Sequence, residues 1–348
     1  MSAAARLRLG LDLGGTKLAG VVMAPDGEVV AARRVLSPRD DYGATVQSIV
    51  DLIERLQDDV GASGIDLKVG IGTPGSWQPG SRTMKNCNSV WLNGQPLLDD
   101  LVARLGPRVR IANDANCFAL SEARDGAGLG SHSMFGVILG TGVGGGLVVN
   151  GSLLGGASGA AGEWGHIPLP YFLQRALLAD AEGSPFADAE GSLAETSPGR
   201  LEATIFQLES RLSHRACYCG RLDCIETFLS GPGLAATHRE LWHESRSPEQ
   251  IARAEREPER RTLALYANML TRSLAQVVNL FDPQTIVLGG GLSNIGSLYG
   301  FIKSDLPRYL FGCQFEGAEQ QAGPAVEPAR WGDDSGVRGA AQLWGRDE

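Results

Sequence analysis

Two glycine-rich turns, each set between a pair of apolar segments, constrain the fold of this 348-residue chain more than any other feature. The first lies in residues 9–23, LGLDLGGTKLAGVVM, and the second in residues 135–151, FGVILGTGVGGGLVVNG. Each pattern predicts a strand, a tight turn and a second strand. Glycine lets the backbone approach an anion closely and turn several N–H groups toward it. Two such hairpins predict a duplicated scaffold that binds one polyphosphate from both sides.

Neither turn fits a better-known nucleotide motif. Residues 15–18, Gly-Thr-Lys-Leu, lack the order of a Walker loop. Residues 140–145 match the dinucleotide fingerprint G-x-G-x-x-G, but that motif needs a helix after the turn, and residues 147–151 are typical of a strand and a turn. The alternative is that both turns are ordinary glycine hairpins. This would suit one turn but fits two poorly, because each turn also carries polar donor side chains.

Composition limits the class of protein. The length allows two domains with cores of their own. The 47 glycines and the 6% aromatic content suit an α/β fold with many tight turns. A net charge of −9 argues against a nucleic-acid partner, and no apolar run is long enough to span a membrane. The first residues enter a strand almost at once, without room for a signal peptide, so we expect a cytoplasmic protein.

Hydrophobic periodicity predicts the order of elements along the chain. Arginine and glutamate alternate over residues 253–261, which indicates a solvated helix face. Residues 171–216 lack strong periodicity and are interpreted as an inserted surface excursion. The expected strands lie within residues 7–36, 67–71, 109–112, 135–151 and 285–288. The expected helices cover residues 46–56, 97–105, 116–125, 263–280 and 337–344.

A cysteine cluster is the second strong signal. Cys217, Cys219 and Cys224 place three thiols within eight residues, a spacing that suits a tetrahedral zinc corner. His166 is the candidate for the fourth ligand, and a Cys₃His site without an open position would hold a structural Zn²⁺. The alternative is a set of buried free thiols. Three further cysteines are isolated and are predicted to be core residues; they are Cys87, Cys117 and Cys313.

Asn113 and Asp114 directly follow the predicted strand at residues 109–112. A carboxylate at the end of a strand, near the seam between two domains, is placed for general-base work on a ligand in the cleft. The alternative is that one of the two residues caps the following helix. Both interpretations stay open at this stage.

Two more carboxylates lie near the zinc motif. Glu163 stands three residues before His166, and Glu226 stands two residues after Cys224. Zinc would hold both segments together, so these carboxylates could meet in one pocket and accept hydrogen bonds from the hydroxyls of a polyol. Without the cysteines, a surface salt bridge would be the favoured interpretation of each glutamate taken alone. Asp12 precedes the first turn, where it could hold Mg²⁺ beside a triphosphate, usually through water.

Together these motifs resemble the ROK family of sugar kinases and repressors. The resemblance covers nearly the whole chain, and its motifs are specific jointly rather than singly. They are residues 12–17, 70–75, 113–114, 140–146, 162–166, the three clustered cysteines with Glu226, and residues 289–291.

The resemblance implies an α/β protein with the actin-like ATPase (hexokinase/ribonuclease H-like) fold, two α/β domains and the active site in the cleft between them. We expect a small domain of residues 1–112 plus 335–348. The large domain would comprise residues 113–334 and include the inserted segment 171–216. The implied activity is ATP-dependent phosphorylation of a hexose, with ATP, Mg²⁺ and a structural Zn²⁺. A homodimer without nucleic-acid or membrane partners is also implied.

The resemblance assigns roles residue by residue. Asp114 matches the catalytic base. The residues that match sugar contacts are Gly75, Asn113, Asp114, Glu163, His166 and Glu226. Those that match the nucleotide site are Asp12, Gly14, Gly15, Thr16, Lys17, Gly140, Thr141, Gly142, Val143, Gly144, Gly289, Gly290 and Gly291. The zinc ligands match His166, Cys217, Cys219 and Cys224.

Within the family, the chain looks most similar to bacterial fructokinases of the manno(fructo)kinase type, which make fructose 6-phosphate from fructose. Residues 91–94, Trp-Leu-Asn-Gly, and the pair Glu163-Trp164 favour this subtype. N-acetylglucosamine kinases and glucokinases of the family are the alternatives.

The other class in the family is a sugar-responsive repressor, which carries a DNA-binding segment before the first turn. Here only about ten residues precede Asp12, so we do not expect a repressor. Two departures from the family stand out. Asp223 replaces the usual glycine of the zinc loop, and the stretch 171–216 is longer than in fructokinases.

Overall fold

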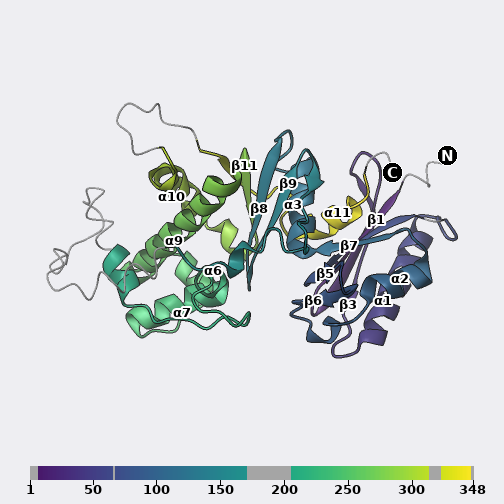
Figure 1. The fold of residues 1–348 in the computed structure, drawn as a ribbon, viewed down its shortest axis with the longest axis horizontal. Helices are drawn as coiled ribbons and strands as arrows, with labels where there is room; N and C mark the ends of the chain where they lie inside the picture. The colour runs from purple at the N-terminus through teal and green to yellow at the C-terminus, as the bar shows by residue number, and fades with distance from the viewer. Residues whose placement is uncertain (1–6, 66, 171–204, 313–322, 346–348) are drawn as a thin grey trace.

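The structure, a computed structural model, describes residues 7–65, 67–170, 205–312 and 323–345. Its first sheet has the strand order β3-β2-β1-β4-β7 (Figure 1). The first three strands form an antiparallel meander, and β4 and β7 continue the sheet parallel to β1. The strands are β1 (Arg8–Leu13), β2 (Lys17–Met23), β3 (Val29–Leu36), β4 (Lys68–Thr73) and β7 (Val109–Asn113).

The second sheet repeats this plan with the order β10-β9-β8-β11-β12. Three antiparallel strands are again followed by two parallel ones. The predicted duplication of the scaffold is therefore confirmed at the level of strand order. The strands are β8 (Ser133–Leu139), β9 (Val143–Val149), β10 (Ser152–Leu153), β11 (Thr285–Gly289) and β12 (Ala325–Pro328). Because β9 follows the second glycine turn directly, the dinucleotide fingerprint lacks its helix.

Helices α1 (Tyr42–Asp59) and α2 (Leu97–Leu105) cover one face of the first sheet, as Figure 1 shows. Apolar residues at helical spacing in α1 are buried against the sheet, and Asp41 caps the helix by accepting a hydrogen bond from the Ala44 N–H. The helices and strands expected in residues 7–112 are confirmed. A small hairpin of β5 (Ser76–Gln78) and β6 (Thr83–Lys85) extends from the end of β4.

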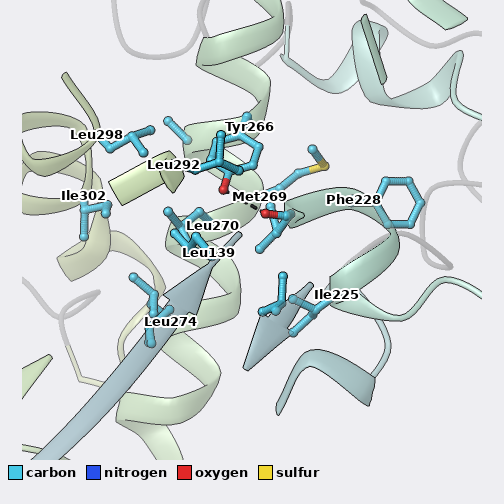
Figure 2. Close-up of a cluster of buried hydrophobic side chains, with 14 of the residues drawn as sticks. Leu139, Ile225, Phe228, Tyr266, Met269, Leu270, Leu274, Leu292, Leu298 and Ile302 are labelled. Carbon is cyan, nitrogen blue, oxygen red and sulfur yellow. Dashed lines mark hydrogen bonds between the residues drawn. The ribbon is translucent and has the colours of Figure 1, made fainter. Parts of the chain in front are cut away.

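The outer face of the second sheet carries the largest core, which is drawn in Figure 2. Its centre is the long helix α9 (Glu257–Phe281), from which Tyr266 donates a hydrogen bond to the Leu229 carbonyl over 2.9 Å. The other helices around it are α6 (Ile225–Leu229), α7 (Gly231–Trp242), α8 (Pro248–Ala252) and α10 (Ser297–Asp305). This core holds α6 beside β9, which decides where Glu226 lies.

Two helices lie between the sheets. Helix α3 (Asp114–Asp125) packs on β8 and β9, and α11 (Ser335–Ala341) packs on β1 and β4. The two helices also contact each other, near the centre of Figure 1. Glycine is required here, because a Cβ atom on Gly339 would overlap the Cys117 carbonyl. The contact brings the two sheets to opposite sides of one helix pair.

The short 3₁₀ segments complete the described elements. They are η2 (Val90–Leu92), η3 (Trp164–His166), η5 (Gly291–Asn294), η6 (Leu306–Tyr309) and η7 (Gly332–Asp334). Cys87 and Cys117 are buried as predicted, whereas Cys313 lies outside the described residues. Among the described residues, no helix combines the length and the apolar character needed to cross a bilayer.

Part of the predicted surface excursion is wrong. Residues 171–204 lie outside the described residues, but residues 205–210 are helical and belong to the core. The apolar repeat of this helix covers only a few residues and is flanked by polar ones. The sequence pattern alone therefore does not predict the helix. The buried side chains are Ile205, Leu208 and Leu212.

A buried ion pair anchors this segment. Arg272 of α9 bonds Glu209 over 2.7 Å and donates to the Pro170 carbonyl over 3.0 Å, so one guanidinium holds residues on both sides of segment 171–204. The expected solvated face at residues 253–261 is likewise only partly right. Glu259 is buried, because its carboxylate caps the start of α9 and pairs with Arg256.

We predict that Arg272→Met lowers the free energy of unfolding by about 3–5 kcal/mol, because it removes the guanidinium that bonds the buried Glu209 carboxylate and the Pro170 carbonyl. Urea unfolding at neutral pH measures the effect. The matched control is Arg33→Met, whose ion pair with Asp59 is half exposed and which should change stability far less than Arg272→Met does. Equal effects in the two variants would contradict the role of the buried pair.

Candidate active site

Parallel strands place the first group of polar residues at one sheet edge. In the register of β1, β4 and β7, Asp12 pairs with Gly72, and Thr73 pairs with Asn113. The carboxyl ends of β1, β4 and β7 therefore meet at the same edge of the sheet. The loop after β4 is fixed there, because Thr73 donates to the Gly75 carbonyl over 2.8 Å.

Close packing explains the glycine in that loop. A Cβ atom on Gly75 would lie 2.6 Å from the Cys87 sulfur, nearer than carbon and sulfur can approach. The absence of a side chain therefore lets the loop pack against the segment that carries Asn86 and Asn88. All three residues line a cleft of about 200 Å³ between the two sheets.

The cleft collects half of the predicted site residues. All six proposed sugar contacts line it, and so does the second glycine turn. The predicted residues found there are Gly75, Asn113, Asp114, Glu163, His166, Glu226, Gly140, Thr141, Gly142, Val143 and Gly144.

Asp114 begins α3 at the wall of this cleft. Asp114 remains exposed to solvent through the open cleft, yet the protein atoms packed around it partly desolvate its carboxyl and raise the pKa to about 6. The charges of Asp12 and Glu163 add to the rise in pKa, and the Ala115 N–H opposes it. A carboxylate that is ionised at neutral pH yet more basic than usual suits general-base work.

The helix-cap alternative holds for Asn113. It does not exclude a catalytic role for Asp114. The Asn113 side chain accepts from the Ala115 N–H over 2.9 Å and is the N-cap of α3. Asp114 is the first residue of the helix and shares the same N–H at 2.7 Å. Asp12 lies near enough to influence Asp114, and burial raises the pKa of Asp12 although Arg34 opposes the rise.

Glu226 joins the zinc-loop region to the second glycine turn. Its carboxylate accepts from the Val143 N–H over 2.9 Å. Gly142 is needed at this point, because a Cβ atom there would lie 2.7 Å from the same oxygen. A surface salt bridge is therefore the wrong interpretation of Glu226, which is packed into the wall of the cleft.

Four metal-ligating side chains meet beside the cleft. The donor atoms of His166, Cys217, Cys219 and Cys224 all lie within 4.8 Å of one another. His166 Nδ1 is 3.5 Å from the Cys217 sulfur, and the sulfurs of Cys219 and Cys224 are also 3.5 Å apart. Ligands of a tetrahedral zinc with bonds near 2.3 Å would be separated by about 3.8 Å. Three thiols and one imidazole therefore fit Zn²⁺ without an open position.

The zinc loop tolerates the unusual Asp223. This residue has φ 56°, in the left-handed region that glycine adopts most readily, so the backbone of the loop keeps the glycine conformation. Its carboxylate accepts from the Arg215 N–H over 2.7 Å and contacts His214 Nδ1 at 2.5 Å. These contacts with the buried carboxylate offset the cost of the left-handed backbone.

A second cavity, of about 860 Å³, adjoins the cleft on the side of the larger lobe. Gly140 and Thr141 line both spaces, and the new walls come from α8 and from η5 with the loop that follows it. Of the predicted glycines 289–291, only Gly291 lines this cavity. Gly289 instead makes room for the Phe118 ring.

The first glycine turn is placed differently from the second. Gly14 donates to the Lys17 carbonyl over 2.9 Å, and this bond closes the turn between β1 and β2. Neither cavity is lined by Gly14, Gly15, Thr16 or Lys17. The turn begins two residues after Asp12, at the same sheet edge as Asn113.

The sequence patterns assign no role to several residues that line the cleft. Asn86 and Asn88 are two of them, and their alternation around Cys87 is the one signal that could have found them. Tyr218 is hidden because it stands between two cysteines. The others include Ser76, Ala115, Asn116, Ile138, Gly159 and Ala161.

These features define the class of protein. A sheet plan that occurs twice around a central cleft is the actin-like ATPase fold, as the sequence predicts. The ROK family model matches residues 8–347, and the chain belongs to this family.

Individual relatives agree with the family. The chain is 36% identical to an N-acetyl-D-glucosamine kinase of Escherichia coli O139:H28, over 96% of this chain and 98% of the relative. A ROK hexokinase structure from Thermus thermophilus has a TM-score of 0.74 at 26% identity, covering 97% of both chains. A ROK glucokinase from Streptomyces griseus, solved with glucose and AMPPNP, has a TM-score of 0.68 at 25% identity, covering 97% of this chain and 98% of that one. The predicted domain bounds and homodimer stay predictions.

We expect purified protein to contain about one zinc ion per chain, measured by elemental analysis, because the four donors close one tetrahedral site. Cys224→Ser should lose the zinc and unfold at a lower temperature, since metal binding contributes to folding. Cys87→Ser is the matched control and should keep the metal. A folded wild-type protein without bound metal would show that the four residues are only free donors.

The pKa of Asp114 predicts how stability depends on pH. Because the folded-state pKa of about 6 exceeds the ordinary value of 3.8, the ionised carboxylate disfavours folding. The contribution of Asp114 to the free energy of unfolding is therefore largest below about pH 4, and it is lost as the pH rises through 6. Asp114→Asn removes the loss.

Urea unfolding at several pH values tests this expectation. The stability advantage of Asp114→Asn over wild type should grow between about pH 4 and pH 7 and then stay constant. An advantage that does not change with pH would mean that the pKa of Asp114 is ordinary.

Proposed function

We propose that the protein is an ATP-dependent hexose kinase that phosphorylates N-acetyl-D-glucosamine. The observation that carries the proposal is the position of Asp114, a carboxylate with a raised pKa between a polar cleft and a glycine turn shared with a second cavity. The similarity to N-acetyl-D-glucosamine kinases over nearly the full chain supports the substrate.

The larger cavity suits a nucleoside. Its walls mix apolar and polar groups, including Pro248, Leu292 and Asn294, as a nucleoside site requires. The shared turn at residues 140–144 would then bind the phosphates through its backbone N–H groups. The first turn, residues 14–17, would approach the phosphates from the other sheet. A Mg²⁺ ion near Asp12 would supply charge neutralisation for phosphoryl transfer.

The reaction follows from the position of Asp114. A primary hydroxyl of the sugar attacks the γ-phosphorus in line with the leaving ADP. A new O–P bond forms, the bond from the γ-phosphorus to ADP breaks, and the hydroxyl proton passes to the Asp114 carboxylate. Asn113, Glu163, His166 and Glu226 would hold the other sugar groups. The proposed structural zinc would keep the segment of His166 beside α6.

The choice of sugar differs from the fructose predicted from the sequence, which is not confirmed. Trp91 donates to Thr45 over 3.1 Å and packs in the smaller lobe. Trp164 is buried and donates to the Gly144 carbonyl over 2.9 Å. Neither tryptophan lines the cleft, so the two tryptophans that favoured fructokinase act in packing, whereas Glu163 does line the cleft.

The composition of the cleft wall agrees with the acetamido sugar. Gly159, Ala161 and Gly162 carry no side chain larger than a methyl group, which leaves space for an acetamido substituent. Asn86 and Asn88 line the same cleft and offer amide groups that can both donate and accept.

An ADP-release assay across a panel of sugars tests the proposal. N-acetyl-D-glucosamine should give a higher kcat/KM than glucose, mannose or fructose. The kcat/KM should rise with pH through about 6, because Asp114 must be ionised to accept a proton. Activity with none of these sugars would refute the kinase, and a preference for fructose would refute the proposed substrate.

Asp114→Asn should lower kcat by about 10²–10⁴-fold, the usual contribution of a general base, while sugar binding by calorimetry persists. The matched control is Asp26→Asn, in an exposed turn far from the cleft in sequence and outside its lining, which should leave kcat unchanged. Near-normal turnover of Asp114→Asn would remove this residue from the mechanism.

A further inference from the structure

Tyr218 stands between two of the metal-ligating cysteines, yet it lines the sugar side of the molecule rather than the cluster. It is 74% exposed, although large aromatic side chains are usually buried. It lines the cleft together with Glu163 and Glu226. The geometry of the zinc loop thus presents a tyrosine to the space where a sugar would bind.

The hydroxyl of Tyr218 has a defined partner. It lies 2.9 Å from His166 Nε2, and the two rings meet edge to face with centroids 5.1 Å apart. The other ring nitrogen, Nδ1, faces the Cys217 sulfur. A metal-ligating Nδ1 leaves the imidazole proton on Nε2, so His166 would donate to the Tyr218 oxygen.

This direction of donation leaves one proton unused. A tyrosine hydroxyl carries one donor and can also accept. If its oxygen accepts from His166, its own O–H can point elsewhere, and the open side of Tyr218 is the cleft. The orientation of the hydroxyl is therefore set from behind by His166.

A donor at this place complements its neighbours. Glu163, Glu226 and Asp114 line the same cleft, and ionised carboxylates can only accept hydrogen bonds. A sugar whose hydroxyl protons go to carboxylates still has oxygen lone pairs that need donors. The Tyr218 hydroxyl can supply one, and its exposed ring can pack against the apolar face of a pyranose.

We propose that Tyr218 is a specificity-determining residue of the sugar site, which donates a hydrogen bond to one oxygen of the hexose while it fixes the orientation of His166. This inference rests on the proposed hexose kinase. It assigns to the residue between Cys217 and Cys219 a role in substrate recognition rather than in metal binding.

Tyr218→Phe removes the hydroxyl and keeps the ring. Calorimetry on the zinc-loaded protein should show that the Kd for the best hexose rises about 5–10-fold, the value of one hydrogen bond. Zinc content and the KM for ATP should not change. Tyr218→Ala should weaken sugar binding further, because the ring is lost as well. Leu222→Ala, an exposed residue of the same loop outside the cleft lining, is the matched control and should bind the sugar normally.

A series of monodeoxy hexoses identifies the contacted oxygen. For one analogue, wild type and Tyr218→Phe should bind alike, because the partner of the hydroxyl is missing. An unchanged Kd in Tyr218→Phe, or an equal loss with every analogue, would overturn the inference. Loss of zinc in Tyr218→Phe would also overturn it, in favour of a structural role at the metal.

The same experiment separates this inference from the proposed function. A wild-type protein that phosphorylates hexoses, with Tyr218→Phe unaffected, leaves the kinase intact and removes Tyr218. A wild-type protein that binds no hexose overturns both.

Discussion

The contact between α3 and α11 is the constraint on which the rest of the structure depends. It requires Gly339, because any larger residue would overlap the Cys117 carbonyl. Its far end is fastened by Glu122, a fully buried carboxylate that accepts from the backbone of Trp331 and from the Ser335 hydroxyl. Since α3 begins at Asp114, this packing sets where the carboxylate lies relative to Asp12 and to the second sheet. The position of the proposed general base is thus a consequence of helix packing.

The cleft is built from segments that are distant along the chain. Glu226 reaches the Val143 N–H from α6, and the Leu229 carbonyl at the end of α6 is fixed by Tyr266. The four donors around His166 hold a loop and a strand-like segment against this helix. A metal bound there would supply no reacting group. It would preserve the geometry that lets acceptors and donors face one substrate.

Local patterns were sufficient to predict the two hairpins, the long helix α9 and the strand-end position of Asp114, because apolar periodicity and strand direction are short-range properties. Contacts between distant segments were not predictable in this way. The helical residues 205–210 were interpreted as surface because their partner, Arg272, lies far along the chain. Trp91 and Trp164 indicate fructose as the substrate at the level of sequence, whereas in the structure both side chains act in packing. Tyr218 was overlooked because its exposure depends on where the zinc loop sits.

Gly140 and Thr141 form a wall common to both cavities, and the Gly140 carbonyl is held by the Gly231 N–H at 2.7 Å. A molecule bound in one cavity therefore contacts the same two residues that form the wall of the other cavity. Thermodynamic linkage makes any resulting communication symmetrical: the factor by which a sugar changes nucleotide affinity must equal the factor by which the nucleotide changes sugar affinity. Because Gly140 and Thr141 belong to both walls, a shift of their backbone would alter the two surfaces together.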